Sequence, residues 1–118
     1  MQPLGHLQER VMLVLWQQGG CSVHQVQEAL NQDPDQAPLA YTTVLTVLRN
    51  LSKRGLLQQE RVTKGRMHMF SPLISRITYL QGLLKRLQQG FFSDDRAAFQ
   101  AFLTAYCQES PESDVRGD

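Results

Sequence analysis

Six polar residues of the stretch AYTTVLTVLRNLSK, residues 40–53, recur at spacings that place them on one side of a helix. On a helical wheel with about 100° per residue, they fall within one arc of roughly 120°. The arc contains the hydroxyl, amide and cationic side chains Thr42, Thr43, Thr46, Arg49, Asn50 and Lys53. Hydroxyls and amides both donate and accept hydrogen bonds, and the cations attract negative charge. The stretch therefore predicts a helix face that binds a partner.

The opposite side of this helix is apolar, with Val44, Leu45, Val47, Leu48 and Leu51. If the polar side simply faced solvent, Glu, Lys and Gln would be expected there in place of threonines, which are mediocre helix formers. We therefore expect the apolar side to face the protein core and the polar side to contact a binding partner.

The charges of the 118-residue chain are unevenly distributed, although the net charge is only +1. Residues 1–92 carry ten Lys and Arg against five Asp and Glu, whereas residues 93–118 carry two against six. Between residues 40 and 76, seven cations are opposed only by Glu60. This local excess favours an anionic partner, and a solvated basic surface is the alternative that charge alone leaves open.

Three helices and two strands are predicted before residue 73. Apolar residues at helical spacing predict a first helix that ends at Gly19. Ser22 is a suitable N-cap for a second helix, and Gly55 closes the third, which runs from about residue 40 to 54. The segments LLQQERV and MHMFSP, joined by TKGR, predict a β-hairpin. This order predicts a mainly α fold with a small β-hairpin, a winged helix-turn-helix.

Two amphipathic helices are predicted after the hairpin. Apolar residues recur every three or four positions from Ile77 to Phe91, and a further helix begins near Asp94 and Asp95, where acidic residues suit the helix dipole. Such short helices have little to bury against within the chain, so dimerisation is favoured over packing back onto the first domain. The predicted dimerisation residues are Ile77, Leu80, Leu84, Leu87, Phe99, Phe102 and Leu103.

The sequence predicts three regions and a soluble protein. These regions are a winged-helix DNA-binding domain over residues 1–73, dimerisation helices over 74–107, and a disordered acidic tail over 108–118. The widely separated Cys21 and Cys107 give no disulfide framework, which indicates a reducing compartment. No signal-peptide pattern or membrane-length apolar run occurs, so we expect a cytoplasmic location without membrane contact.

No residue pattern indicates catalysis or metal binding. The histidines His6, His24 and His68 occur singly, without the clustering of a metal site. Asp94 and Asp95 suit a helix start better than an acid–base pair. We therefore expect no enzyme activity, no metal ion and no cofactor.

DNA is the partner that best fits the polar helix face. In a helix-turn-helix, the second helix of the pair enters the major groove, where hydroxyls can bond bases and threonine methyls can contact the thymine methyl. Cations at the hairpin tip would bind the adjacent phosphate backbone. The predicted DNA-binding residues are Thr42, Thr43, Thr46, Arg49, Asn50, Lys53, Lys64 and Arg66. An acidic protein bound by the same basic face is the alternative.

Three segments resemble the penicillinase-repressor family of BlaI, MecI and CopY. They read LGHLQERVMLVLW, AYTTVLTVLRNLSKRGLL and FSPLISRITYL, within a resemblance over about residues 4–92. The resemblance implies a homodimeric repressor of resistance or stress-response genes that binds a palindromic operator and releases it on a signal. It assigns the recognition role to Thr42, Thr43, Thr46, Arg49 and Asn50, and the wing role to Lys64 and Arg66.

The releasing signal is not indicated by the sequence. Relatives switched by proteolysis carry an Asn-Phe bond, and no Asn-Phe dipeptide occurs in this chain. Copper-switched relatives carry paired Cys-x-Cys clusters near the C-terminus, where this chain has only Cys107. A regulatory protease or sensor partner is therefore left unidentified.

Overall fold

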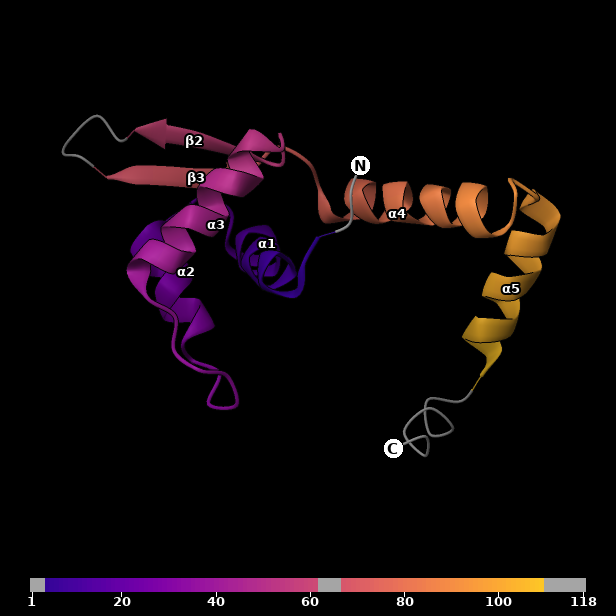
Figure 1. Ribbon diagram of the computed structural model, residues 1–118, viewed down its shortest axis with the longest axis horizontal. Coiled ribbons are helices and arrows are strands. Elements are labelled where there is room, and N and C mark those ends of the chain that lie inside the picture. The colour runs from indigo at the N-terminus through magenta and orange to yellow at the C-terminus, as the bar shows by residue number, and fades with distance from the viewer. Residues whose placement is uncertain (1–3, 62–66, 110–118) are drawn as a thin grey trace. The chain divides into compact units, whose positions relative to one another are not determined.

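The computed structural model describes residues 4–61 and 67–109 (Figure 1). The elements are α1 (His6–Gln18), β1 (Cys21–Ser22), α2 (Val23–Leu30), α3 (Tyr41–Lys53), β2 (Leu57–Arg61), β3 (His68–Pro72), α4 (Arg76–Phe91) and α5 (Arg96–Gln108). The chain forms two compact units, Met1–Tyr79 and Leu80–Asp118.

The first unit contains three helices that contact one another, and local chemistry sets their ends. The Ser22 hydroxyl oxygen accepts a hydrogen bond from the Gln25 backbone N–H at 3.2 Å, while the Gln25 side-chain oxygen accepts one from the Ser22 N–H at 2.8 Å. This reciprocal pair is a capping box that starts α2. Gly19 and Gly55, with φ of 81° and 82°, adopt the left-handed conformation that follows α1 and α3. The three predicted helices are confirmed.

The predicted hairpin is part of a three-stranded antiparallel sheet with strand order β1-β3-β2. Strand β2 pairs with β3, and β1 pairs with the other edge of β3, with Cys21 opposite Phe70. Strand β1 consists of two residues, too few for an alternating pattern to predict it. The predicted wing residues Lys64 and Arg66 lie outside the described residues, as does the tail predicted over 108–118 from residue 110 on. Gln108, which was placed in that tail, is instead the last residue of α5.

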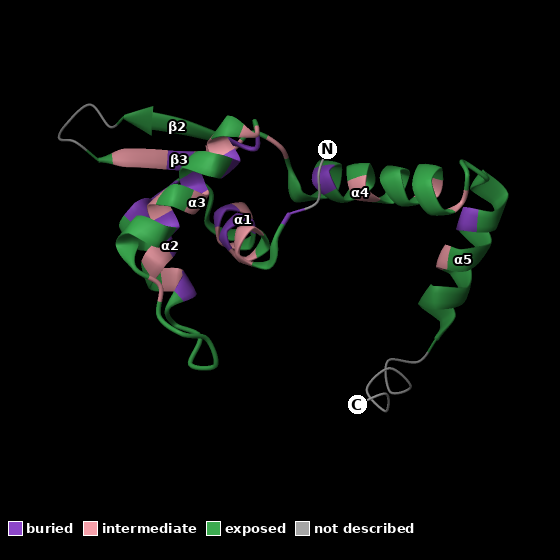
Figure 2. Cartoon of the chain, viewed as in Figure 1, coloured by how far each residue is buried: buried purple, intermediate pink, exposed green. Residues whose placement is uncertain are grey.

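The hydrophobic core of the first unit lies between its helices and sheet, where Figure 2 shows buried residues on every helix. Phe70 of β3, Leu15 of α1 and Leu48 of α3 are fully buried. Burying one such side chain contributes about 1.5–3 kcal/mol to the free energy of folding. The core therefore fixes α3 against the other two helices and the sheet.

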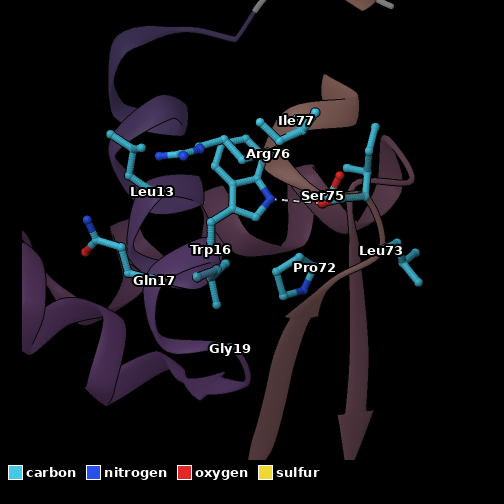
Figure 3. Close-up of a pocket in the computed structure, with 11 residues that line it drawn as sticks. Leu13, Trp16, Gln17, Gly19, Pro72, Leu73, Ser75, Arg76 and Ile77 are labelled. Carbon is cyan, nitrogen blue, oxygen red and sulfur yellow. Dashed lines mark hydrogen bonds between the residues drawn. The ribbon is translucent and has the colours of Figure 1, made fainter. Parts of the chain in front are cut away.

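Trp16 of α1 holds the segment that follows the sheet (Figure 3). Its indole Nε1 donates a hydrogen bond to the backbone carbonyl of Ile74 at 2.9 Å, and its ring centroid lies 5.8 Å from that of Tyr79. The phenolic oxygen of Tyr79, which is buried, accepts a hydrogen bond from the Leu4 backbone N–H at 3.2 Å. Residues 74–79, including the first turn of α4, are thereby attached to the first unit.

A Trp16→Phe substitution tests this attachment, because it keeps an aromatic ring but removes the hydrogen-bond donor. We expect the free energy of unfolding to fall by about 1 kcal/mol, since the carbonyl of Ile74 loses its partner. Urea denaturation followed by far-UV circular dichroism measures the change. Gln17→Ala, at the exposed neighbouring position, is the control and should leave the stability unchanged. Equal stability of both variants would contradict the role given to the indole.

The second unit comprises most of α4, together with α5. The Asp95 carboxylate accepts a hydrogen bond from the Ala98 backbone N–H at 3.1 Å, which caps α5 near the predicted start. Phe92, between the two helices, lies against Phe99 and Phe102 of α5, with ring centroids 5.1 Å and 5.4 Å away. These aromatic contacts form a small apolar cluster within the second unit.

Candidate nucleic-acid interface

The polar face of α3 is open to solvent along its whole length. The exposed residues are the six predicted on this helix: Thr42, Thr43, Thr46, Arg49, Asn50 and Lys53. On the other side, Val44, Leu48 and Leu51 are buried, with exposed fractions of 1%, 0% and 0%. Because these apolar side chains fix the rotation of the helix in the core, the polar face is held outward.

The Thr46 hydroxyl already makes one contact within the helix. Its Oγ1 donates a hydrogen bond to the Thr42 backbone carbonyl at 2.9 Å. The hydroxyl proton is thereby used, but the oxygen can still accept a hydrogen bond and the methyl group can make an apolar contact. Thr46 is therefore suited to meet a donor group or a methyl group on a partner.

Side chains of α2 and of Asn31, the residue that follows α2, hold the chain immediately before α3. The Leu39 carbonyl accepts hydrogen bonds from the side-chain amides of Gln27 at 3.0 Å and Asn31 at 3.2 Å. The Leu39 N–H donates to the Asn31 side-chain oxygen at 2.8 Å. At the first position of α3, the Tyr41 ring centroid lies 4.7 Å from that of His24 in α2. These contacts fix the N-terminal end of α3, which carries the first two threonines.

The sheet continues this surface beside α3. Arg61 at the end of β2 is exposed and lies opposite His68 of β3, while the Gln59 side-chain nitrogen is 3.0 Å from Nδ1 of His68. A hollow of about 190 Å³ lies between α2, α3 and β3, and its lining includes His24, Arg49 and His68. The guanidinium of Arg49 and the imidazoles of His24 and His68, from three elements, therefore gather in one hollow at the side of α3.

The apolar side of α4 is also exposed. Ile77, Leu80, Leu84 and Leu87 have exposed fractions of 57%, 43%, 40% and 40%. A row of exposed apolar side chains of this length marks an interaction surface.

The predicted dimerisation residues of α5 differ from one another in burial. Phe102 is 51% exposed, whereas Phe99 is only 6% exposed because it packs against Phe92. Leu103 is partly buried. Phe99 therefore stabilises the second unit itself, and Phe102 and Leu103 offer more of their surface to a partner.

The sequence model of the family described as penicillinase repressor matches residues 4–115. The chain belongs to the penicillinase repressor family. This membership confirms the resemblance that the sequence segments indicated.

Two curated relatives of this chain are named transcriptional regulator BlaI, and both are from Mycobacterium tuberculosis. Each is 42% identical over 82 residues, which cover 69% of this chain and 56% of the relative. The match thus spans little more than half the length of these relatives. The family and its named members are transcriptional regulators and not enzymes, which confirms the prediction that the chain is no enzyme.

Solved structures confirm the fold of this family member. The solution structure of the DNA-binding domain of the repressor BlaI matches 67% of this chain and 94% of that domain, with a TM-score of 0.51 and 24% identity. The PcaV transcriptional regulator from Streptomyces coelicolor matches 89% of this chain and 72% of PcaV, with a TM-score of 0.52 and 23% identity. The mainly α winged helix with a small β-sheet is therefore correct.

The described parts of this penicillinase repressor family chain contain no site for thiol chemistry or metal binding. Burial raises the pKa of the Cys21 thiol, which keeps it protonated and unreactive, while Cys107 is exposed on α5. Over residues 4–61 and 67–109, no three His, Cys, Asp or Glu residues form a group that could hold a metal ion. No helix in these two ranges has the length and apolar character needed to cross a membrane.

Proposed function

We propose that this chain is a transcriptional repressor that binds a palindromic DNA operator as a homodimer and controls resistance or stress-response genes. In this proposal, α3 enters the major groove and the wing contacts the adjacent backbone. The observation that carries the proposal is the exposed face of α3, where hydroxyl, amide and cationic groups stand opposite the buried side chains Val44, Leu48 and Leu51. The names of the BlaI relatives, a transcriptional regulator and a repressor with a DNA-binding domain, support it.

The chemistry of the α3 face suits the major groove. Hydroxyl and amide groups can bond base edges, and an Asn side chain can bind adenine through two hydrogen bonds. Arg49 and Lys53 lie further along the same face and can bind base edges or phosphates. In this proposal, Thr42, Thr43, Thr46 and Asn50 read sequence, and the cations of the helix and wing, including Lys64 and Arg66, fix the register.

Dimerisation would supply two copies of this face. A two-fold dimer presents its recognition helices to half-sites about one helical turn apart, which matches a palindromic operator. We assign the dimer contacts to the exposed row of α4 and the exposed apolar residues of α5, namely Ile77, Leu80, Leu84, Leu87, Phe102 and Leu103, with Phe99 supporting them from within. The identity of the regulated genes rests on the family alone.

Titration of the full chain with labelled duplex DNA at several salt concentrations tests the proposal. Binding that neutralises phosphates releases counterions, so we expect the logarithm of the association constant to fall linearly with that of the salt concentration, by about 0.9 per phosphate contacted. Selection of bound sequences from random duplexes should then yield a palindrome.

An acidic protein is the alternative partner of the same basic face. In that case any binding of duplex DNA would show no sequence preference, and selection would return no common sequence. Either result would contradict the operator proposal. A selected sequence without two-fold symmetry would leave DNA binding intact but contradict the palindrome.

A further inference from the structure

A groove of about 620 Å³ lies on the first unit between α1 and the segment that leads from β3 into α4 (Figure 3). Its lining residues fall between Leu13 and Gly19 and between Pro72 and Ile77, all within this unit. Small-molecule sites have volumes of about 300–1,000 Å³. The groove is therefore large enough for a ligand, and none of the residues proposed to contact DNA lines it.

The walls of the groove are largely apolar and open to solvent. Leu13 of α1 is 44% exposed, and Leu73, which follows β3, is 57% exposed. Trp16 is only partly buried, although its Nε1 is already bonded to the Ile74 carbonyl. The open part of an indole ring can pack against a flat apolar group. A ligand with such a body would therefore cover apolar surface that water now contacts.

The polar side chains of the groove favour a single negative charge. Arg76 places a guanidinium in the lining, which includes no Asp or Glu, and Figure 3 shows its side chain extending past the Trp16 ring toward Leu13. Among the described residues, no carboxylate forms an ion pair with Arg76. A guanidinium can bind a carboxylate through two parallel hydrogen bonds. A group with two negative charges would leave one of them unpaired beside apolar walls.

The Ser75 hydroxyl contributes little to ligand binding because it is used at the start of α4. It accepts a hydrogen bond from the Thr78 backbone N–H at 3.0 Å and donates one to the Thr78 hydroxyl oxygen at 2.9 Å. Gln17, by contrast, has an exposed amide in the lining. Arg76 and Gln17 are therefore the side chains that can bind the polar end of a ligand.

The groove joins the two parts of the chain that the proposed function uses together. Helix α1 contacts α2 and α3, which carries the recognition face, and residues 72–77 lead into α4. Ile77 belongs both to the lining and to the proposed dimer row. The hydrogen bond from Trp16 to Ile74 holds the two parts together. A ligand that packs between them would change their spacing, and with it the spacing of the two recognition helices in a dimer.

We propose that this groove is the effector site of the repressor and binds a small monocarboxylate with a flat apolar body. The carboxylate pairs with Arg76, and the apolar body lies against Trp16, Leu13 and Leu73. The ligand favours a spacing of the recognition helices that does not fit the operator, so it shifts the population away from the DNA-bound form. The effector role rests on the proposed DNA-binding function, whereas ligand binding itself does not.

The single tryptophan of the chain reports directly on the groove, because Trp16 lies in its lining. The full chain is titrated with 3-phenylpropionate and excited at the red edge of the indole absorption, where the probe does not absorb. We expect a saturable change in emission, with a dissociation constant on the order of 1 mM for a probe of this size. The uncharged 3-phenylpropanamide should bind roughly fivefold more weakly, as expected for loss of an exposed ion pair.

Two results of this titration would contradict the proposal. Equal affinities for the acid and the amide would overturn the choice of a carboxylate. The lack of a saturable change with either probe would overturn the site.

Substitution of Arg76 tests the residue that selects the charge. Arg76→Gln should lower the affinity for the acid to that for the amide and leave the affinity for the amide unchanged, whereas Arg76→Lys should keep part of the preference. Arg86→Gln is the matched control, because it removes the same charge from an exposed position of α4 outside the lining. If Arg86→Gln also lost the preference, general charge attraction would explain it, and the role of Arg76 would be overturned.

The apolar wall is tested by Leu73→Ser. Leu73 is an exposed residue, so its substitution should leave the fold intact, which circular dichroism checks. The variant should bind the acid and the amide more weakly by the same factor. Unchanged affinity for both probes in a folded variant would overturn the assignment of the apolar body to this groove.

Anisotropy titrations of the full chain with operator DNA, with and without saturating 3-phenylpropionate, test the effector role. Operator affinity should fall by at least about fivefold in the unsubstituted chain, and by much less in Arg76→Gln at the same probe concentration. Probe binding without a change in operator affinity would overturn the effector role and leave the site intact. Failure of the chain to bind any DNA would overturn the proposed function, while the tryptophan titration would still decide the site.

A second copy of the chain is the alternative occupant of the groove, because Ile77 also belongs to the proposed dimer row. Dilution of the chain from dimer to monomer distinguishes the two. We expect the Trp16 emission to stay constant on dilution, since the ligand and not the partner covers the ring. A change on dilution as large as the change caused by 3-phenylpropionate would assign the groove to the dimer contact and overturn the proposal.

Discussion

A chain that carries both Leu84→Asp and Leu87→Asp is expected to sediment as a monomer and to bind the operator at least about a hundredfold more weakly than the unsubstituted chain. Both leucines are 40% exposed on the apolar side of α4, and neither belongs to the buried core. Two carboxylates in a proposed dimer contact would have to lose their water, which costs several kcal/mol for each unpaired charge. The monomer would then hold only one half-site, and the second binding event would no longer be intramolecular.

A matched variant with Arg86→Gln and Gln89→Asp is the control for this prediction. It changes the charge of α4 by the same amount, at exposed positions on the side away from the apolar row. It should sediment as a dimer and keep most of its operator affinity. If the leucine variant is also a dimer, the interface lies elsewhere, and the exposed row on α4 needs another partner.

The helices could be predicted because their boundaries depend on residues close together in the sequence. Ser22 and Gln25 form the cap of α2 across three positions, and Gly55 follows α3 in a conformation that glycine adopts without strain. The rotation of α3 could be predicted for the same reason, because the apolar residues that enter the core alternate with the polar ones along one helix.

The sheet could be predicted only in part. The hairpin strands are neighbours in the sequence, but β1 exists only through its pairing with β3, where Cys21 lies opposite Phe70. A strand of two residues is too short to show a sequence pattern that would predict this pairing. The attachment of residues 74–79 to α1 through Trp16 is likewise a long-range contact, so the sequence boundary at residue 73 and the unit boundary after Tyr79 differ.

The candidate site likewise has one part that the sequence predicts and one part that only the folded chain assembles. The α3 face could be read from one helix, whereas the hollow beside it needs α2, α3 and β3 to be folded together. His24 and His68 appear in the sequence as isolated histidines, and their common position follows only from the fold. The apolar row of α4 could be recognised from its spacing, but that spacing does not identify what would bind to it.

An Asn50→Ala substitution should weaken binding to the selected operator by ~1 to 3 kcal/mol and leave binding to random duplexes nearly unchanged. Asn50 is exposed on the same face as the threonines, and its amide can make two hydrogen bonds to an adenine edge that alanine cannot replace. Thr46→Ala should show the same selectivity, because its free acceptor and methyl group would meet a base and not a phosphate. Anisotropy titrations with operator and random duplexes at one salt concentration measure both affinities.

Lys53→Gln is the contrasting variant on the same helix. Lys53 is exposed at the end of α3, where its ammonium group would bind a phosphate. Its loss should therefore weaken operator and random duplexes alike and reduce the salt slope by about one unit. The two kinds of variant must differ if α3 lies in the major groove, since base contacts distinguish sequences and phosphate contacts do not. If Asn50→Ala weakened random and operator duplexes equally, Asn50 would not read a base, and the orientation proposed for α3 would be wrong.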